Sequence, residues 1–191
     1  MTAAREAAPE KREQILGATI RVLTERGLSG LKVEDVARAA EVGKGTVYLY
    51  FADKQALLKA LVEQRTRQFY AEAETATQAA GSFEERLRRL LGCRFAFIEE
   101  WRGLWWAVAQ EASGETDWLV RLHETYQGIL ERFVTTAVDG HELPPHDIRL
   151  TALVLSALGY PQLPVEREAF INHLCSVLVS GLRQPEQAGA R

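Results

Sequence analysis

The chain has 191 residues, of which 47% are hydrophobic and 26% are charged, a composition typical of a globular protein. Its two cysteines stand far apart, so we expect neither a disulfide framework nor a zinc ribbon, but a reduced, cytoplasmic protein. The longest nearly apolar run, residues 150–160, is too short for a membrane span, which needs about 20 residues. Residues 1–10 lack the apolar segment of a signal peptide.

The net charge of −3 hides an asymmetry along the chain. Residues 1–60 carry 10 basic and 8 acidic side chains, whereas residues 61–191 carry 13 and 18. The lysines all lie in the first part: Lys11, Lys32, Lys44, Lys54 and Lys59. This distribution favours an N-terminal part that faces an anion, joined to an acidic remainder, although chance clustering explains it equally well.

Apolar residues recur at helical spacing along nearly the whole chain. In the first third, one apolar stripe begins at Ile15 and predicts a helix that Gly27 ends. Two shorter stripes predict helices over residues 33–40 and 47–51. Asp53 can then cap the N-terminus of a long fourth helix.

The rest of the chain continues this helical pattern. Ser82 and Glu85 form a capping box that opens the next helix, which extends to Trp101. The remaining predicted helices cover, in chain order, residues 105–109, 117–138, 148–158 and 165–182, before a loose tail at residues 184–191. No strand is expected, so the predicted fold is all-α with about nine helices.

Residues 32–51, with the sequence KVEDVARAAEVGKGTVYLYF, predict two short helices separated by a tight turn. Ala37 is small where two crossing helices must approach each other. Val42 and Val47 are apolar where the turn and the second helix must pack against the core. This is the helix-turn-helix arrangement, whose second helix enters the major groove of DNA. A plain helical hairpin with surface lysines is the alternative.

Residues 9–60 resemble the N-terminal domain of TetR-family transcriptional regulators. The resemblance rests on the run KGTVYLYF as recognition helix, on the VEDVARAA helix before it, and on Asp53-Lys54 and Leu57-Leu58 after it. It implies a DNA-binding domain at residues 9–60 with a helix-turn-helix at 32–51, and a fourth helix from about residue 53 that bridges domains. It further implies a helical ligand-binding and dimerisation domain at residues 61–183, which match the family only in class.

Three positions depart from the family pattern. Glu41 stands where a turn glycine is usual, and a left-handed conformation there would cost roughly 1–2 kcal/mol. Gly43 replaces the serine that caps the recognition helix, so no side-chain oxygen is available. Leu31-Lys32 replaces a threonine pair, so an ammonium takes the place of a hydroxyl at a phosphate.

The expected DNA contacts combine cations with small and amphipathic side chains. Lysines bind phosphates, which position the protein without specifying a sequence. Gly45 leaves room for a close backbone approach, and Thr46 can contact a base edge or a thymine methyl. Of Tyr48 and Tyr50, one is expected to reach a phosphate and the other to pack in the core. The complete set is Lys32, Val33, Lys44, Gly45, Thr46, Tyr48, Tyr50 and Lys54.

Aromatic residues and one arginine stand out in the second domain. The resemblance places a pocket among its central helices, where aromatic walls suit a flat or apolar ligand. The expected lining is Arg94, Phe97, Trp101, Trp105, Trp118 and Tyr126, with simple core packing as the alternative. Arg94 lies in the centre of an apolar stripe, so its charge must be paired or reach solvent. It is either a structural ion pair with a glutamate or the counter-ion of an acidic ligand.

The last two predicted helices carry apolar residues on more than one face. Such helices are buried on both sides. One side packs on its own domain, and the other most simply packs on a second subunit, as the resemblance also implies. The expected interface residues are Leu155, Ile171, Leu174, Leu178 and Leu182.

No catalytic motif supports an enzyme. The chain has neither G-x-S-x-G nor H-E-x-x-H, and its histidines lack metal-binding spacing, so we expect no catalytic residue, metal or cofactor. The sequence therefore predicts a homodimeric repressor that a small hydrophobic or acidic effector releases from a palindromic operator. The alternatives are a constitutive DNA-binding protein without an effector and, more distantly, an all-α enzyme.

Overall fold

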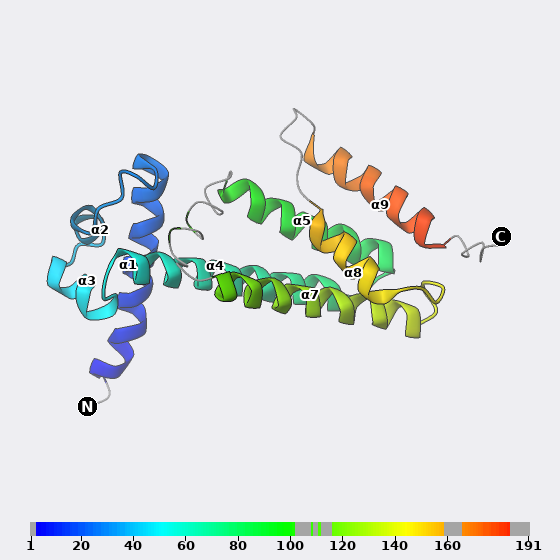
Figure 1. Cartoon of the computed structure of the whole chain (residues 1–191), viewed down its shortest axis with the longest axis horizontal. Helices are drawn as coiled ribbons and strands as arrows, with labels where there is room; N and C mark the ends of the chain where they lie inside the picture. Colours follow the sequence, from blue (N-terminus) through cyan, green and yellow to red (C-terminus); the bar gives the residue numbers. More distant parts are fainter. Residues whose placement is uncertain (1–2, 102–107, 109–110, 112–115, 159–165, 184–191) are drawn as a thin grey trace. The chain divides into compact units, whose positions relative to one another are not determined.

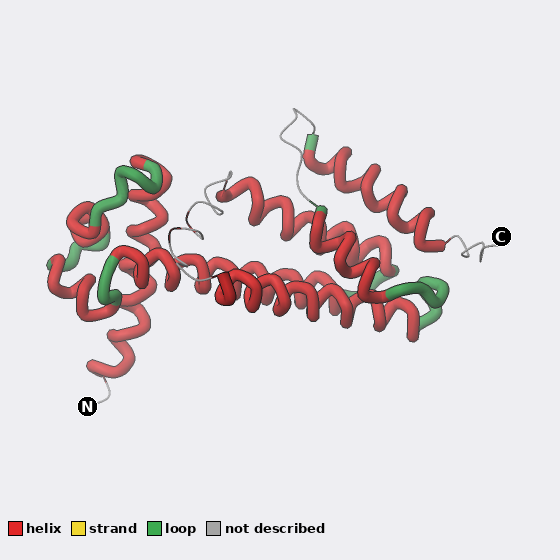
Figure 2. The backbone as a smooth tube through the Cα atoms, in the orientation of Figure 1, coloured by secondary structure: helices red, strands yellow, loops and turns green. Residues whose placement is uncertain are grey.

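The computed structural model describes residues 3–101, 108, 111, 116–158 and 166–183, and the regular structure in these residues is entirely helical (Figures 1 and 2). The described helices are α1 (Ala3–Arg26), α2 (Val33–Ala39), α3 (Lys44–Tyr50), α4 (Lys54–Gln78), α5 (Phe83–Trp101), α7 (Thr116–Asp139), α8 (Ile148–Ala157) and α9 (Arg167–Arg183). The predicted all-α fold is confirmed. The predicted short helix at residues 105–109 falls almost wholly outside the described residues, as does the tail at 184–191.

The chain divides into two compact units. The first comprises Met1–Thr66 together with Arg102–Leu119, and the second comprises Arg67–Trp101 together with Val120–Arg191. Helix α4 passes from one unit into the other. The sequence placed the domain boundary near residue 60, with the fourth helix bridging the domains.

In the first unit, α1 ends where the sequence predicts. Gly27 is left-handed at φ +69, and its N–H donates to the carbonyl oxygen of Leu23 at 2.9 Å. Side chains of α1 then tie it to the end of α2: Gln14 donates to the Ala40 carbonyl at 2.8 Å and Arg21 to that of Ala39 at 2.6 Å. The core beneath these helices consists of Ile15, Leu16, Ala18, Val22, Leu23, Val36, Ala37, Val47 and Phe51.

The turn between α2 and α3 is a Schellman C-cap. The N–H of Glu41 donates to the Arg38 carbonyl at 3.1 Å, and the N–H of Val42 donates to the Ala37 carbonyl at 3.0 Å. Glu41 adopts φ +52, the left-handed conformation considered above for this position. A residue with a Cβ pays roughly 1–2 kcal/mol there, so the hydrogen bonds and the core packing of the two helices must hold the turn.

Helix starts also follow the sequence. Asp53 caps α4 by accepting a hydrogen bond from the Ala56 N–H at 2.7 Å. Gly43 precedes α3 with extended backbone and no side-chain cap, as its lack of a side chain requires. Asp147 caps α8 by accepting from the Leu150 N–H at 2.9 Å. None of the helices in the described part of the chain is long and apolar enough to cross a membrane.

The second unit is a bundle with one large apolar core. Residues of α4, α5, α7, α8 and α9 contribute to this core, and α9 packs against α5. Phe83 of α5 stacks on Phe133 of α7 with ring centroids 4.8 Å apart, and Phe95 of α5 lies 5.6 Å from Phe170 of α9. Polar contacts join the same helices, since Arg88 donates to Asn172 at 2.9 Å.

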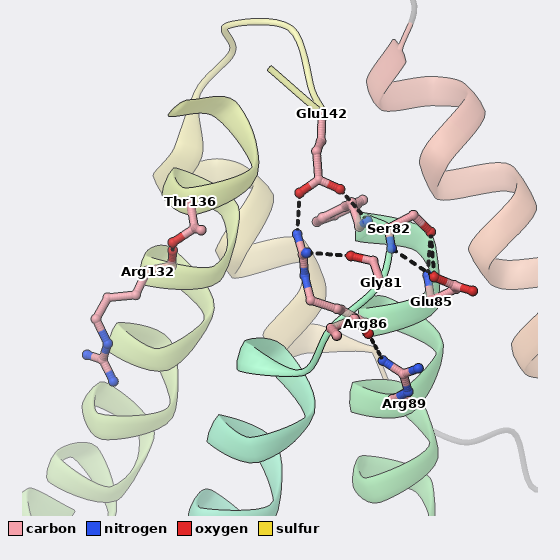
Figure 3. A network of polar contacts seen from close by, with 10 residues as sticks. Gly81, Ser82, Glu85, Arg86, Arg89, Arg132, Thr136 and Glu142 are labelled. Atoms are coloured by element: carbon pink, nitrogen blue, oxygen red, sulfur yellow. Dashed lines mark hydrogen bonds and ion pairs between the residues drawn. The ribbon is translucent and has the colours of Figure 1, made fainter. Parts of the chain in front are cut away.

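A polar network closes one end of this bundle (Figure 3). Glu142, in the loop between α7 and α8, accepts a hydrogen bond from the Phe83 N–H at 2.6 Å and forms an ion pair with Arg86. Arg86 also donates to the Gly81 carbonyl at 2.7 Å. The predicted capping box is confirmed, because the Ser82 N–H donates to Glu85 at 2.8 Å and the Glu85 N–H to the Ser82 hydroxyl at 3.3 Å. A distant carboxylate therefore supplements the local cap of α5.

Candidate nucleic-acid interface and effector site

Helix α3 presents its side chains to solvent and is held to the core by one of them. Val47 is 1% exposed, whereas Tyr48 is 44% and Leu49 84% exposed. Gly45 is exposed as well, and a Cβ on it would meet no atom within 4 Å, so the surface around it is open. This face combines a cation, an aromatic ring and an apolar side chain on one short helix.

Lys44, the first residue of α3, is engaged with its neighbours. Its ammonium pairs with Glu34 of α2 and lies 5.7 Å from the centre of the Tyr48 ring. The hydrogen bond between Lys44 and Glu34 raises the pKa of Lys44 and lowers that of Glu34, so both groups are charged at neutral pH. Both side chains are about half exposed, which leaves the pair open to exchange for another anion.

Leu49 is a candidate contact that sequence reasoning missed. It is the most exposed of the large apolar side chains described, although it lies between the buried residues Val47 and Phe51. The spacing of the sequence indicates this exposure, because a residue two positions from each of two buried neighbours points to the opposite side of a helix. An apolar side chain on this face can contact a thymine methyl group.

The other predicted DNA contacts divide into exposed and buried residues. Lys32 is exposed at the start of α2, and Thr46 and Tyr50 are partly buried on α3. Val33 is a correction: its side chain is 9% exposed and belongs to the core, because the first turn of α2 packs it inward. Lys54 is partly buried and donates to the Leu28 carbonyl and to Glu111, both at 3.4 Å.

Four aromatic residues gather in the second unit. Phe69 of α4 lies 4.8 Å from Phe97 of α5 and 5.1 Å from Tyr126 of α7. Tyr70 stacks on Tyr126 at 6.1 Å and donates its hydroxyl hydrogen to the Leu122 carbonyl. The structure thus brings together two of the predicted lining residues, Phe97 and Tyr126, and adds two from α4 that the sequence did not single out. We call Phe69, Tyr70, Phe97 and Tyr126 the aromatic group.

Arg94 lies beside this aromatic group. Its guanidinium carbon is 5.1 Å from the centre of the Tyr126 ring, in a cation–π arrangement. Burial raises the pKa of the Tyr126 hydroxyl, and the Arg94 charge opposes that rise. The tyrosine is therefore neutral at physiological pH, and the aromatic group is an apolar part of the core with one cation at its edge.

The partners of Arg94 differ from the expected glutamate. Its Nε donates to the Leu158 carbonyl at 2.9 Å and its Nη2 to the Ser156 carbonyl at 2.7 Å. Helix α8 ends at Ala157, so these are carbonyl oxygens that the helix leaves without an intrahelical partner. A cation is favourable at this end of a helix dipole. Arg94 therefore ties α5 to the end of α8, with no carboxylate bonded to it among the described residues.

The predicted tryptophans do not join the aromatic group in the described structure. Trp118 belongs to the first unit, where its indole N–H donates to Glu63 at 3.2 Å and its ring lies 5.5 Å from the Lys59 ammonium. Trp105 lies outside the described residues, and for Trp101, the last residue of α5, only the backbone is described.

The predicted dimer residues lie against the core of their own unit to different degrees. Leu155 is 2% and Ile171 6% exposed. Leu174, Leu178 and Leu182 are partly buried against the same core. The large apolar side chains that these two helices expose are Leu150 (59%), Leu153 (40%) and Val154 (52%) on α8, and Val177 (55%) on α9. We call these four residues the outer face of α8 and α9.

Two hollows open among the described residues of the second unit. A groove of about 640 Å³ is lined by Ala71, Glu72, Thr75, Ala76, Ala79, Arg89, Gly92 and Cys93. A cleft of about 370 Å³ is lined by Glu74, Thr77, Gln78, Ala79, Arg86, Ile129, Arg132, Phe133 and Thr136. Neither includes a residue predicted to bind an effector. No cluster of three or more metal-binding side chains occurs in the part of the chain that the structure describes.

Comparison with known proteins agrees with the helix-turn-helix geometry. Residues 15–61 match the family described as bacterial regulatory proteins, tetR family. The HTH-type transcriptional regulator BetI of Cronobacter sakazakii is 30% identical over 166 residues, which cover 78% of this chain and 76% of BetI.

Two solved structures share the fold. The transcriptional regulator FadR from Bacillus subtilis, in complex with stearoyl-CoA, aligns with a TM-score of 0.67 and 22% identity over 88% of this chain and 98% of FadR. AibR, in complex with isovaleryl coenzyme A and operator DNA, aligns with a TM-score of 0.63 and 18% identity over 88% and 98% of the two chains.

Proposed function

The chain belongs to the TetR family of DNA-binding transcriptional regulators, and we propose that it is a homodimeric repressor released from a palindromic operator by a small effector. The observation that carries this proposal is the exposed face of α3. This seven-residue helix displays a cation, a tyrosine and an 84% exposed leucine, which are groups suited to contact phosphates and base edges. Because the members of this family are regulators, we do not propose an enzymatic activity.

On DNA, the residues of α3 would have separate tasks. Lys44, Lys32 and Lys54 would bind phosphates and set the position of the protein on the duplex. Thr46 and Leu49 would contact base edges and thymine methyl groups, each with about 1–3 kcal/mol of discrimination at a good contact. The exposed Tyr48 suits a phosphate contact, whereas the partly buried Tyr50 also packs near Phe51, with ring centroids 6.5 Å apart.

A dimer would use the outer face of α8 and α9. Its four large apolar side chains are 40–59% exposed in the single chain, and a second copy would cover them by the same face. A two-fold dimer presents two recognition helices to successive major grooves, so the operator would be palindromic. As a regulator acting on DNA, the protein would work in the cytoplasm.

The effector would bind at the aromatic group. The group offers apolar side chains of the core, which an effector would have to displace, and the Arg94 guanidinium at its edge offers a partner for a carboxylate or phosphate. We therefore propose an effector with an apolar body and an acidic group. Acyl-coenzyme A compounds are the first to test, since FadR and AibR bind stearoyl-CoA and isovaleryl coenzyme A.

Helix α4 provides a route from effector to DNA. It begins four residues after α3 ends, and it carries Phe69 and Tyr70 of the aromatic group. An effector that displaced these residues would bias the position of the same helix that follows the recognition helix. The effector must bind the DNA-free conformation more tightly, since a ligand shifts an equilibrium only by its differential affinity.

The proposal is tested by release of DNA. A duplex selected by the protein from a randomised library is labelled, and its anisotropy is followed as acyl-CoAs, coenzyme A alone and free fatty acids are added. We expect release by compounds that carry an apolar chain, and weaker release of the Arg94→Met variant. Arg121→Met, which removes an exposed arginine of α7, is the matched control. If no compound releases the DNA from a protein that binds it tightly, the alternative of a constitutive DNA-binding protein is favoured.

A further inference from the structure

Lys54 is held by a carboxylate from a distant part of the chain. Its ammonium lies 3.4 Å from Oε1 of Glu111 and donates to the Leu28 carbonyl, also at 3.4 Å. The side chains of Lys54 and Glu111 are 33% and 46% exposed, so solvent and other anions can reach the pair. Lys54 is the first residue of α4, which follows the helix-turn-helix in the chain. A DNA phosphate is the partner proposed above for its ammonium.

Two described residues on either side of Glu111 in the chain are buried. Val108 is fully buried, and Trp118 is 5% exposed. The indole N–H of Trp118 donates to Glu63 and its ring receives the Lys59 ammonium, and both partners lie on α4, the helix that begins with Lys54. In the chain, Glu111 thus lies between two buried residues, one of which contacts the helix that begins with Lys54.

We infer that Glu111 is an autoinhibitory contact that competes with an operator phosphate for Lys54. This inference rests on the proposed function, because it needs Lys54 to face DNA. The Lys54 ammonium has three donor hydrogens, of which the Leu28 carbonyl and Glu111 take two, so a phosphate would bind beside the Glu111 carboxylate and be repelled by it. Binding of the phosphate is therefore weakened for as long as the pair stays closed.

A second ion pair in the same unit, Lys44 with Glu34, differs from the Lys54–Glu111 pair in where its carboxylate lies in the chain. Lys44 is paired with Glu34, but both belong to the helix-turn-helix, so that pair moves as one body with α2 and α3. Glu111 lies on the connection between α5 and α7, the helices that carry Phe97 and Tyr126 of the aromatic group. Opening of the Lys54–Glu111 pair therefore does not require any change within α2 and α3.

A double-mutant cycle on duplex DNA tests the competition without an effector. The full-length protein and the variants Glu111→Gln, Lys54→Met and Glu111→Gln/Lys54→Met are titrated onto a labelled random-sequence duplex between 50 and 200 mM salt, roughly the range in which phosphate contacts dominate affinity. Glu74→Gln is the matched control. It removes the same charge from an exposed ion pair, Glu74 with Arg132 at 2.9 Å, in the second unit.

The competition predicts a gain that depends on Lys54. Glu111→Gln should tighten binding about 2- to 5-fold more than Glu74→Gln, the range for an exposed ion pair, and should steepen the salt slope by about one contact. In the Lys54→Met background, Glu111→Gln should have no effect beyond that of Glu74→Gln. Thermal unfolding of each variant shows that the fold is retained.

Three results separate the possible failures. If Glu111→Gln and Glu74→Gln behave alike on DNA that the protein binds, the competition is wrong and the proposed function stands. If the gain persists without Lys54, Glu111 acts through general charge, and the inference is also overturned. If the unaltered protein does not bind duplex DNA at the lowest salt, the proposed function itself fails.

Discussion

Helix α3 and the aromatic group both carry tyrosines, but these tyrosines differ in how deeply they are buried. On α3, Tyr48 is 44% exposed and Val47 alone anchors the helix in the core, whereas Tyr126 of the aromatic group is 5% exposed. The exposed side chains of α3 therefore contribute little to stability and are available for recognition. Those of the aromatic group belong to the core, so any binding role they have is coupled to packing. Substitutions of exposed residues on α3 should therefore change DNA binding without changing stability. Substitutions in the aromatic group should change both stability and effector binding.

The largest expected effect compares two tyrosines. Tyr126→Ala should lower the free energy of unfolding by about 3–5 kcal/mol, because it removes a buried ring and leaves a cavity. Tyr48→Ala should change it by less than about 0.5 kcal/mol, as an exposed substitution does. Urea denaturation of both variants measures the difference. Equal losses would mean that α3 is packed as tightly as the aromatic group.

A third kind of surface sharpens the contrast, because it is exposed only in the single chain. Val154→Glu, on the outer face of α8 and α9, should weaken the proposed dimer by about 100-fold or more, since it would bury an unpaired carboxylate. Val120→Glu, on α7, places the same charge at a valine that is 47% exposed, compared with 52% for Val154. Sedimentation at micromolar concentration distinguishes them. A stable monomer of the unaltered protein would refute the dimer.

Within the second unit, substitution of two glutamates in ion pairs tests how the burial of an ion pair determines its contribution to the free energy of unfolding. Glu142→Gln should lower the free energy of unfolding by about 2 kcal/mol, because it leaves Arg86, whose side chain is 12% exposed, without its anion. Glu74→Gln breaks the exposed pair with Arg132 and should lower it by less than about 1 kcal/mol. Denaturation midpoints with unchanged slopes give both values. Similar losses would show that the network of Figure 3 does not hold α5.

The smallest expected effect is a gain. Glu41→Gly should raise the free energy of unfolding by about 1 kcal/mol, because glycine adopts the left-handed conformation at φ +52 without a steric penalty. Glu85→Gly, at an exposed position inside α5, is the opposite control and should be destabilising, since glycine weakens a helix interior and the capping box is lost. A loss of stability in Glu41→Gly would indicate that the glutamate side chain itself stabilises the turn.

The sequence predicted the helix ends and turns of the first unit well, because interactions between residues close in the chain determine them. Gly27 and Asp53 act on backbone groups within a few residues and behave as their residue types require, whereas Glu41 adopts the left-handed conformation that its place in the turn requires. Leu49 was overlooked because the motif drew attention to its charged and hydroxyl-bearing residues, although the spacing alone placed it on the exposed side.

Long-range packing explains what the sequence missed in the second unit. Leu155 and Val154 are adjacent in a helix that is apolar all round, and only the rest of the unit decides that Leu155 is 2% and Val154 52% exposed. The same holds for Arg94, whose partners are carbonyl oxygens more than 60 positions away. No local pattern distinguishes such partners from a glutamate.

The central claim is that the exposed face of α3 reads DNA, and one titration series tests it directly. Lys44→Ala and Leu49→Ala are compared with the unaltered protein on a library-selected duplex and on a random duplex, each over a range of salt. Lys44→Ala should weaken binding to both duplexes alike and lower the salt slope by about one. Leu49→Ala should weaken only the selected duplex, by about 1–3 kcal/mol, and leave the salt slope unchanged. Unchanged binding by both variants, or an equal loss on both duplexes for Leu49→Ala, would contradict the account.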